Sequence, residues 1–408
     1  MTQTAHRDFA ALLDPATRAN PYPVLDGMRE TGPFQLFDGA LTMIGEYAQC
    51  MRMLRDPSVS SERFRSLMTQ ARGVDPQQRD GISFLSLDPP DHTRLRRLVS
   101  KAFTPRVIAA QRPRIVETVD QRLTEAAEAG SIDVVSGLAY PLPVRIISEL
   151  LGVPPDDRHR IEAWSRRLVR ALDPALSVTD PQASADGLLA GDEFREYFRG
   201  LIADRRRRPG EDLLTRLVQI EESGDQLTEP ELLATCTLLL VAGHETTANL
   251  IANGVLALLR NPDQLALLRA HPELVAGAVE EALRYDPPVQ MTTRVARTPR
   301  SVGSVTAPAD GMLVLLIAAA NRDPAQFDRP AEFDITRERN QHLAFAAGAH
   351  FCLGAALARL EASVAFTQFA GRVVAPVLDE QSLSYRPHVN LRGPDRCTVG
   401  FADLRPLS

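Results

Sequence analysis

Apolar residues recur every three to four positions through most of the chain, which is the spacing of one face of an α-helix. Residues 1–20 show no such period and predict an irregular start. The periodic stretches predict helices at 23–31, 45–54, 115–129, 142–152, 157–171, 185–207, 229–260, 276–284 and 355–371. The predicted fold class is therefore mainly α.

Shorter stretches alternate apolar and polar residues, as half-buried strands do. Residues 33–37 and 41–44 flank Asp38-Gly39, which predicts a hairpin. Further strands are expected at 291–296, at the start of 312–320, and at 384–392 and 397–402. Small sheets near the N-terminal and C-terminal parts should therefore accompany the helices.

Two segments lack any period and lie between helices. Residues 58–86 are polar, with a few apolar members that include Phe84 and Leu85. Residues 171–183 contain two prolines and several small polar residues. Long loops in a compact enzyme often cover a substrate site, but mobile surface loops have the same composition. We keep both interpretations, and in the first one Phe84 and Leu85 line a pocket.

The longest predicted helix begins at a capping box, in which Thr228 precedes Glu231 and a proline occupies the first turn. About 32 residues at ~1.5 Å each make a rod of ~48 Å, enough to cross the molecule. Its early turns are apolar on most faces, so much of the helix should be buried. Leu238 and Val241 belong to this part.

The middle of this helix breaks several local rules. Ala242-Gly243 is followed by His244-Glu245-Thr246-Thr247. Gly243 weakens a helix, and a carboxylate in apolar surroundings costs several kcal/mol unless it is compensated. Rules broken together in a buried element point to function. A zinc-protease motif is excluded because position 248 is alanine, where the second histidine would stand.

A second unusual stretch, residues 345–354, leads directly into the last predicted helix. Cys352 stands just ahead of that helix, where free amides and the positive helix end favour a thiolate. Such a thiolate is either a nucleophile or a metal ligand. No second Cys or His stands at zinc-ligand spacing. A single axial thiolate is sufficient for haem, whose porphyrin supplies the other four donors.

Composition narrows the setting. The net charge of −6 argues against a general nucleic-acid binder. Four widely separated cysteines form no disulfide framework, which fits a reducing compartment, and no run of eighteen apolar residues could span a membrane. We therefore expect a cytoplasmic protein. One concentrated basic region suggests an acidic partner, although solvation alone could explain it: Arg94, Arg97, Lys101, Arg106, Arg112 and Arg114.

The stretch around Cys352 resembles the haem-binding loop of the cytochrome P450 family, whose marker positions are filled here by Phe345, Gly348, His350, Cys352 and Gly354. The resemblance covers the chain from about residue 20 to the end. It implies a single domain over 1–408 with the family's triangular-prism fold. It also implies one haem b between the central helix and the helix after Cys352, with Cys352 as the axial iron ligand.

The resemblance also implies roles for other residues. His92 and Arg96, four apart on one helical face, together with Arg294, would hold the haem propionates. Ala242 and Gly243 would leave room for dioxygen, and Glu245 and Thr246 would form the acid–alcohol pair that delivers protons. Two residues three apart, within 276–284, would form a buried structural pair, with Arg337 as a candidate third member: Glu281 and Arg284.

The implied reaction is insertion of one oxygen atom from O2 into an apolar small molecule of terpenoid, steroid, fatty acyl or polyketide type. Electrons would come from a separate ferredoxin and its reductase. The residues expected to face the substrate are Phe84, Leu85, Leu238, Val241, Gln290, Thr292 and Pro394. Two alternatives remain: a haem-thiolate enzyme that uses peroxide or couples substrates, and a non-enzymatic haem sensor or electron carrier.

Overall fold

The computed structural model describes residues 2–70, 81–101, 103–173, 180–222 and 227–407. Helices dominate it, as the sequence predicts. The α-helices of the N-terminal half are α1 (Thr2–Leu13), α2 (Tyr22–Glu30), α3 (Tyr47–Arg55), α4 (Leu67–Gln70), α5 (Asp91–Ser100), α6 (Pro105–Ala109), α7 (Arg112–Ala127), α8 (Pro141–Leu150), α9 (Arg158–Leu172) and α11 (Pro181–Arg207). Those that follow are α12 (Leu213–Glu222), α13 (Glu229–Arg260), α14 (Pro262–Ala270), α15 (Val275–Tyr285), α16 (Ile317–Ala320) and α17 (Ala355–Arg372).

The strands form one larger sheet and several small ones. The five-stranded sheet has the order β1-β2-β8-β5-β3, built from Phe34–Leu36, Leu41–Ile44, Met312–Leu315, Thr292–Ala296 and Val59–Ser60. Only β2 and β8 in this sheet run parallel. The small sheets use β4 (Ser131–Asp133), β6 (Arg300–Val302), β7 (Val305–Ala307), β9 (Val373–Val374), β10 (Val377–Leu378), β11 (Ser384–Tyr385), β12 (Pro394–Arg396), β13 (Thr398–Gly400) and β14 (Asp403–Leu404).

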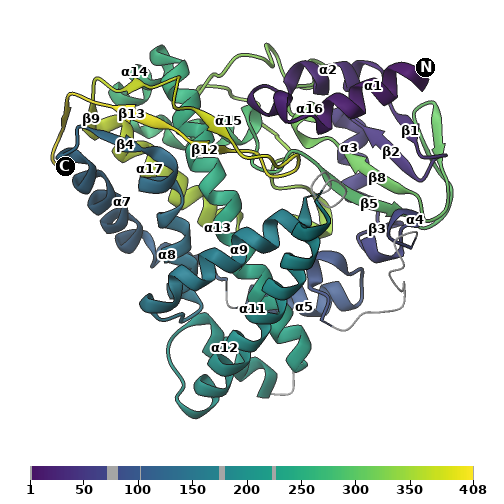
Figure 1. The fold of residues 1–408 in the computed structure, drawn as a ribbon, viewed down its shortest axis with the longest axis horizontal. Helices are drawn as coiled ribbons and strands as arrows, with labels where there is room; N and C mark the ends of the chain where they lie inside the picture. The colour runs from purple at the N-terminus through teal and green to yellow at the C-terminus, as the bar shows by residue number, and fades with distance from the viewer. Residues whose placement is uncertain (1, 71–80, 102, 174–179, 223–226, 408) are drawn as a thin grey trace.

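The elements fill a roughly triangular outline, with the five-stranded sheet, α1, α2 and α16 at one corner and most helices in the remainder (Figure 1). Helix α13 crosses the middle of the molecule and packs against α8, α15 and α17. Its N-terminus is closed by the predicted capping box: Glu231 Oε2 accepts from the Thr228 amide at 2.8 Å, and Thr228 Oγ1 accepts from the Glu231 amide at 3.4 Å. The helix holding the unusual central residues is therefore a fixed, buried axis of the fold.

A buried ion pair anchors the segment that precedes Cys352. Arg284 on α15 donates to both oxygens of Glu281, at 2.7 and 2.8 Å, and both side chains are fully buried. Arg337 adds a third contact to Glu281 at 3.1 Å. The remaining Arg284 hydrogens go to backbone carbonyl oxygens, so the buried charges are fully paired. The pair thus connects α15 to the chain that leads into the Cys352 loop.

Three sequence expectations about secondary structure need correction. The chain begins with a helix, α1, whose Leu12 is buried against α2 and β1, and not with an irregular segment. Residues 58–86 contain short ordered elements, β3, a turn of 3-10 helix at Arg63–Arg65 (η2), α4 and another at Phe84–Ser86 (η3), while 71–80 lie outside the described residues. The strand expected over 384–392 is only two residues long.

The second expected lid, 171–183, falls mostly outside the described residues, since 174–179 are not part of them. Its described ends belong to α9 and α11, which pack against each other. Asp173, between them, accepts hydrogen bonds from the amides of Val389 and Asn390 at 2.7 and 3.1 Å. The C-terminal part of the chain is therefore tied to the end of α9.

Candidate active site

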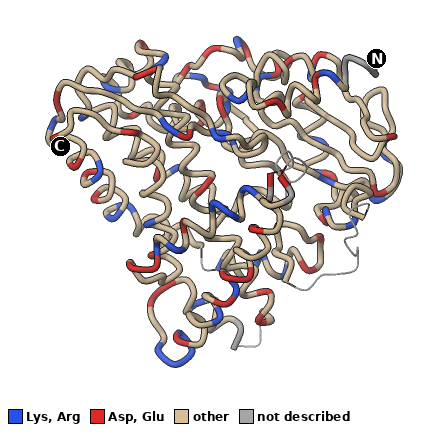
Figure 2. Tube along the Cα trace, viewed as in Figure 1, with Lys and Arg blue, Asp and Glu red and all other residues tan. Residues whose placement is uncertain are grey.

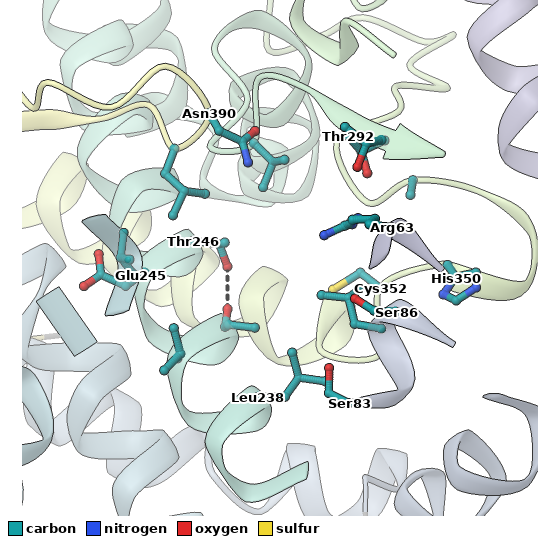
Figure 3. Close-up of a pocket in the computed structure, with 18 of the residues that line it drawn as sticks. Arg63, Ser83, Ser86, Leu238, Glu245, Thr246, Thr292, His350, Cys352 and Asn390 are labelled. Atoms are coloured by element: carbon teal, nitrogen blue, oxygen red, sulfur yellow. Dashed lines mark hydrogen bonds between the residues drawn. The ribbon is translucent and has the colours of Figure 1, made fainter. Parts of the chain in front are cut away.

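A cavity of about 1430 Å³ lies between the middle of α13 and the loop that carries Cys352. Its walls come from elements far apart in the sequence: α1, η2, η3, α13, β5, residues 345–354 and residues 388–391. Most of the lining is apolar, and the polar groups are few (Figure 3). A large apolar cavity with a small number of placed polar groups is the usual form of a cofactor and substrate site.

The Cys352 loop is held in one shape by its backbone. The Cys352 amide donates to the Phe345 carbonyl oxygen at 2.9 Å, which closes the loop. Gly348 has a φ of 71°, and a Cβ there would stand 2.6 Å from the carbonyl oxygen of Leu54, so only glycine fits. Phe345 is buried with the Arg359 guanidinium 4.6 Å from its ring centre, and this contact ties the loop to α17.

The sulfur of Cys352 faces the cavity just before α17 begins (Figure 3). Burial raises the pKa of its thiol, while amide hydrogen bonds from Gly354 and Ala355 and the positive charges of Arg96 and Arg359 act in the opposite direction. The net effect is a raised pKa, so the lowered pKa expected from the helix end is wrong for the protein groups alone. A metal ion bound to the sulfur would supply the positive charge that favours the thiolate. The described residues contain no cluster of three or more His, Cys, Asp and Glu side chains able to hold a metal. The residue here that could bind the iron of a haem is Cys352.

Four of the predicted cofactor residues lie together beside the Cys352 loop. His92 on α5 and His350 have ring centres 4.1 Å apart. Arg96 and Arg294 are close enough for their charges to act on His350, so the four side chains form one basic group. Burial, followed by the charge of His92, lowers the pKa of His350 to about 3. Burial also lowers the pKa of Arg294 to about 10. Such a buried group of cations and imidazoles needs anionic partners.

The unsatisfied atoms of this group fit a haem. Both ring nitrogens of His92 are buried and have no hydrogen-bond partner among the described residues. Buried polar atoms are rarely left in this state, so an absent ligand is the natural explanation. The two propionates of haem b would bring two carboxylates, which match Arg96 and Arg294 in charge and the two histidines in hydrogen bonding. The residues present therefore fit the cofactor.

On the opposite wall, Thr246 and Glu245 point in different directions (Figure 3). Thr246 lines the cavity, and its hydroxyl donates to the Ala242 carbonyl oxygen at 2.8 Å. The Glu245 carboxylate is buried and turned toward Tyr140 and Arg386, at 3.1 and 2.8 Å. The acid and the alcohol are neighbours in sequence, but their side chains do not touch each other in this structure.

Ala242 and Gly243 also line the cavity, as the resemblance implies. A second constraint also favours glycine at position 243, because a Cβ there would stand 3.2 Å from Cγ1 of Ile147 on α8. That distance is tighter than ordinary contact, so the glycine also allows α8 to approach α13.

Five of the residues expected to face substrate line the cavity: Phe84, Leu85, Leu238, Val241 and Thr292. The other two, Gln290 and Pro394, are not among its described lining residues. Gln290 is buried and donates instead to the Pro287 carbonyl oxygen at 2.7 Å. Pro394 starts β12, after Gly393, whose backbone packs closely on the Asn249 side chain of α13. The expectation that Gln290 and Pro394 face the cavity is therefore wrong for this structure.

Several lining residues carry no recognisable sequence signal. Phe9 and Leu12 of α1 reach the cavity, and Asn390 lies on its wall, although none belongs to a motif (Figure 3). Arg63 also points into the cavity, from a segment that shows no pattern in the sequence. Arg386, the partner of Glu245, lies beside β11. Only the spatial arrangement reveals these residues.

Among the described residues, no helix combines the length and the apolar character needed to cross a bilayer. The longest apolar helix, α13, is enclosed by other helices and is a core element.

Comparison with known proteins agrees with this site. The family model "Cytochrome P450" matches residues 41–370. Cytochrome P450 107B1 of Saccharopolyspora erythraea is 42% identical over 88% of this chain and 88% of its own length. Vitamin D(3) 25-hydroxylase of Pseudonocardia autotrophica is 41% identical over 93% of each chain.

Among solved structures, ligand-free CYP164A2 of Mycobacterium smegmatis superimposes with a TM-score of 0.90 and 46% identity, covering 96% of this chain and 99% of that one. The matched region contains both walls of the cavity, α13 and the Cys352 loop. The chain therefore belongs to the cytochrome P450 family, the haem b-dependent monooxygenases among the oxidoreductases.

Proposed function

We propose that this single-domain protein hydroxylates or epoxidises a large apolar molecule, with electrons from a separate ferredoxin and its reductase. The observation that carries the proposal is the pairing of one cavity-facing thiolate, Cys352, with Thr246 across a mainly apolar chamber. When bound, haem activates dioxygen and transfers one of its atoms to a C–H bond or a double bond. The protein would hold the cofactor, orient the substrate and deliver protons.

Cys352 would be the iron ligand, with the amides of Gly354 and Ala355 tuning its basicity. His92, Arg96, Arg294 and His350 would hold the propionates and so fix the rotation of the cofactor in its plane. Side chains that already lie in one buried group need little rearrangement to do so.

Thr246 would present its hydroxyl to water or dioxygen in the cavity. In the absence of a ligand, that hydroxyl bonds to its own helix, and one rotation about χ1 would release it. Glu245, on the far side of the helix, would connect Thr246 with the polar group formed by Tyr140, His244 and Arg386. Protons would reach the site along this route.

The size and lining of the cavity support a bulky, mostly aliphatic substrate. The chamber of about 1430 Å³ must accommodate both cofactor and substrate, and its wall includes Leu238, Val241 and Leu85. A relative named vitamin D(3) 25-hydroxylase is consistent with an apolar ring-containing substrate. We include terpenoid, fatty acyl and polyketide-like molecules in the same class.

The ferredoxin would dock on the face near α5 and α6. Arg97, Arg106 and Arg112 are exposed there. Within the same basic set, Arg94 pairs with Glu231, and Arg114 pairs with Glu117 and Glu149. Figure 2 shows basic and acidic residues following one another along α7, whereas Asp91 is the one acidic residue in the sequences of α5 and α6. Reducing conditions, as in a cytoplasm, suit the four free cysteines.

The test is spectroscopic and catalytic. The reduced protein treated with carbon monoxide should show the strongly red-shifted Soret band of thiolate ligation, and Cys352→Ser should abolish it. Cys236→Ala, at a buried cysteine of α13, should keep it. With ferredoxin, reductase and O2, a panel of apolar compounds should yield a product containing one added oxygen atom. A carbon monoxide spectrum typical of imidazole ligation would contradict the proposal. So would turnover that occurs with peroxide but not with O2, ferredoxin and reductase.

A further inference from the structure

Arg63 is a partly buried cation, and no acidic side chain among the described residues pairs with it. It belongs to η2, and its side chain points into the cavity (Figure 3). Its Nε atom is fully buried and has no hydrogen-bond partner. Burial lowers the pKa of Arg63, and no acidic group opposes that effect. A guanidinium that faces a mainly apolar cavity without an ion-pair partner favours an anion as an occupant of that cavity.

The nearby carboxylates are already engaged elsewhere. Glu62 is adjacent to Arg63 but pairs with Arg65 at 2.9 Å. Asp88 accepts from the Ser61 amide at 2.8 Å and pairs with Arg297. After burial, the charge of Arg63 lowers the pKa of Arg294, so this charged neighbour of Arg63 is also positive. A change in the Arg63 rotamer would therefore not bring it a counter-ion, because both neighbouring carboxylates are already bonded to other groups.

The backbone of η2 holds Arg63 in this position. The Arg63 amide donates to the Ser61 carbonyl oxygen at 2.9 Å, and the Arg63 carbonyl oxygen accepts from Thr69 Oγ1 at 2.8 Å. Since both backbone groups are bonded, the side chain leaves the chain in a fixed direction. A guanidinium held in place forms its fork of hydrogen bonds with little loss of entropy.

The cofactor does not need this charge. Haem b brings two carboxylates, and the two arginines already assigned to them, Arg96 and Arg294, carry two full positive charges. Arg63 lines the same cavity as Arg96, Arg195 and Arg199, and the last two are already paired with carboxylates. Once haem is accounted for, the occupant of the cavity that could bring an anion to Arg63 is the substrate.

We propose that Arg63 binds a carboxylate of the substrate, so that the enzyme prefers apolar molecules carrying one acid group. A carboxylate matches the guanidinium in charge and in its two-pronged geometry. The hydroxyls of Ser86 and Thr292 lie beside Arg63 on the cavity wall and could share the anion, and Leu238 could contact the apolar part (Figure 3). This inference rests on the proposed function, because it names the substrate class of that site.

The experiment uses the haem-loaded enzyme and optical titration of the Soret band. The probes are straight-chain acids of ten, twelve and fourteen carbons, each beside the alcohol of equal length. Charge-assisted hydrogen bonds contribute ~1.5–3 kcal/mol, so at least one acid should bind about 10-fold to 100-fold more tightly than its alcohol. Arg63→Gln should remove this preference and leave the dissociation constants of the alcohols within about twofold.

The matched control is Arg65→Gln, in the same turn, whose side chain is 43% exposed and already paired with Glu62. It should keep the preference for acids. The proposal is overturned if no acid binds better than its alcohol, or if Arg63→Gln keeps the preference. It is also overturned if Arg63→Gln, but not Arg65→Gln, speeds haem transfer to apomyoglobin, since Arg63 would then serve a propionate. The thiolate spectrum with carbon monoxide tests the proposed function separately.

Discussion

Arg386 Nη1 donates a hydrogen bond of 2.8 Å to Oε2 of Glu245 and so links the β11–β12 hairpin to the middle of α13. The other carboxylate oxygen accepts from the Tyr140 hydroxyl at 3.1 Å. Burial tends to raise the pKa of Glu245, but His244 and then Arg386 outweigh it and lower the pKa to about 2. The carboxylate is therefore ionised throughout the working range, and it can only pass on protons that it first receives.

Replacing Arg386 by glutamine should destabilise the protein at neutral pH. Removing one partner of a buried pair costs roughly 3–5 kcal/mol. Without Arg386, the pKa of Glu245 rises from about 2 toward or above its ordinary value, so the remaining penalty disappears as the carboxylate is protonated. The gap in melting temperature between wild type and Arg386→Gln should be widest at pH 7 and should narrow as the pH falls below about 4.3 toward about 2.

The sign follows from the direction of the shift. A group whose folded pKa is depressed stabilises the fold above its unfolded pKa and loses that contribution as the pH falls through the folded value. His244 and His388 also act on this carboxylate, so the titration is compared between the two proteins and not read from one alone. A gap that is constant or widens on acidification would contradict the assignment.

Replacing Thr246 by alanine should separate oxygen consumption from product formation. The variant lacks the hydroxyl that faces the cavity, so protons are delivered poorly and reducing equivalents are lost as hydrogen peroxide. We expect several-fold less product for each O2 consumed, measured with an oxygen electrode and chromatography. Thr246→Ser keeps a hydroxyl and should recover most of the coupling. Full coupling in the alanine variant would remove Thr246 from the proton route.

Reversing the charge at Arg97 or Arg106 should slow reduction by an acidic ferredoxin. Both side chains are exposed near the Cys352 side of the molecule, and long-range attraction acts mainly on the association rate. The effect should be about tenfold or less per charge and should shrink at high salt, because the Debye length falls to ~3 Å at 1 M. Arg208→Glu, at the exposed end of α11, is the control. Equal effects at all three positions would indicate net charge and not docking.

Two ion pairs of equal length allow a direct test of burial. Arg284 contacts Glu281 and Arg329 contacts Glu332, each at 2.7 Å, but the first pair is fully buried and both members of the second are 57% exposed. Glu281→Gln should cost roughly 3–5 kcal/mol of unfolding free energy, whereas Glu332→Gln should cost about 1 kcal/mol or less. Urea titration of both variants measures the difference, and similar losses would refute the structural role of the buried pair.

Much of the helical framework could be predicted because local chemistry decides it. The start of α13 follows from Thr228 and Glu231, which form their capping box without help from the rest of the fold. The loop before α17 was predicted from the residues around Cys352. By contrast, α1 has only a few apolar residues, and its helical state depends on Leu12 packing into a core built by later segments.

Positions around the cavity were harder to predict, because tertiary contacts decide which way a side chain turns. Gln290 would face the cavity in a regular strand, but its amide bonds to Pro287 before β5 begins. Pro394 is absent from the lining although residues 388–391 of the same segment belong to it, and nothing in the local sequence separates the two. Arg63 lies in a stretch without period or motif, and only the fold shows that it is enclosed.

Helix α1 supplies Phe9 and Leu12 to the wall of the central chamber, on the same side as β2 and β8. Side chains of this first helix would thus contact the small molecule that occupies the cavity. A truncation that removes Phe9 and Leu12 would therefore change the shape of the chamber and, with it, the selectivity for the ligand.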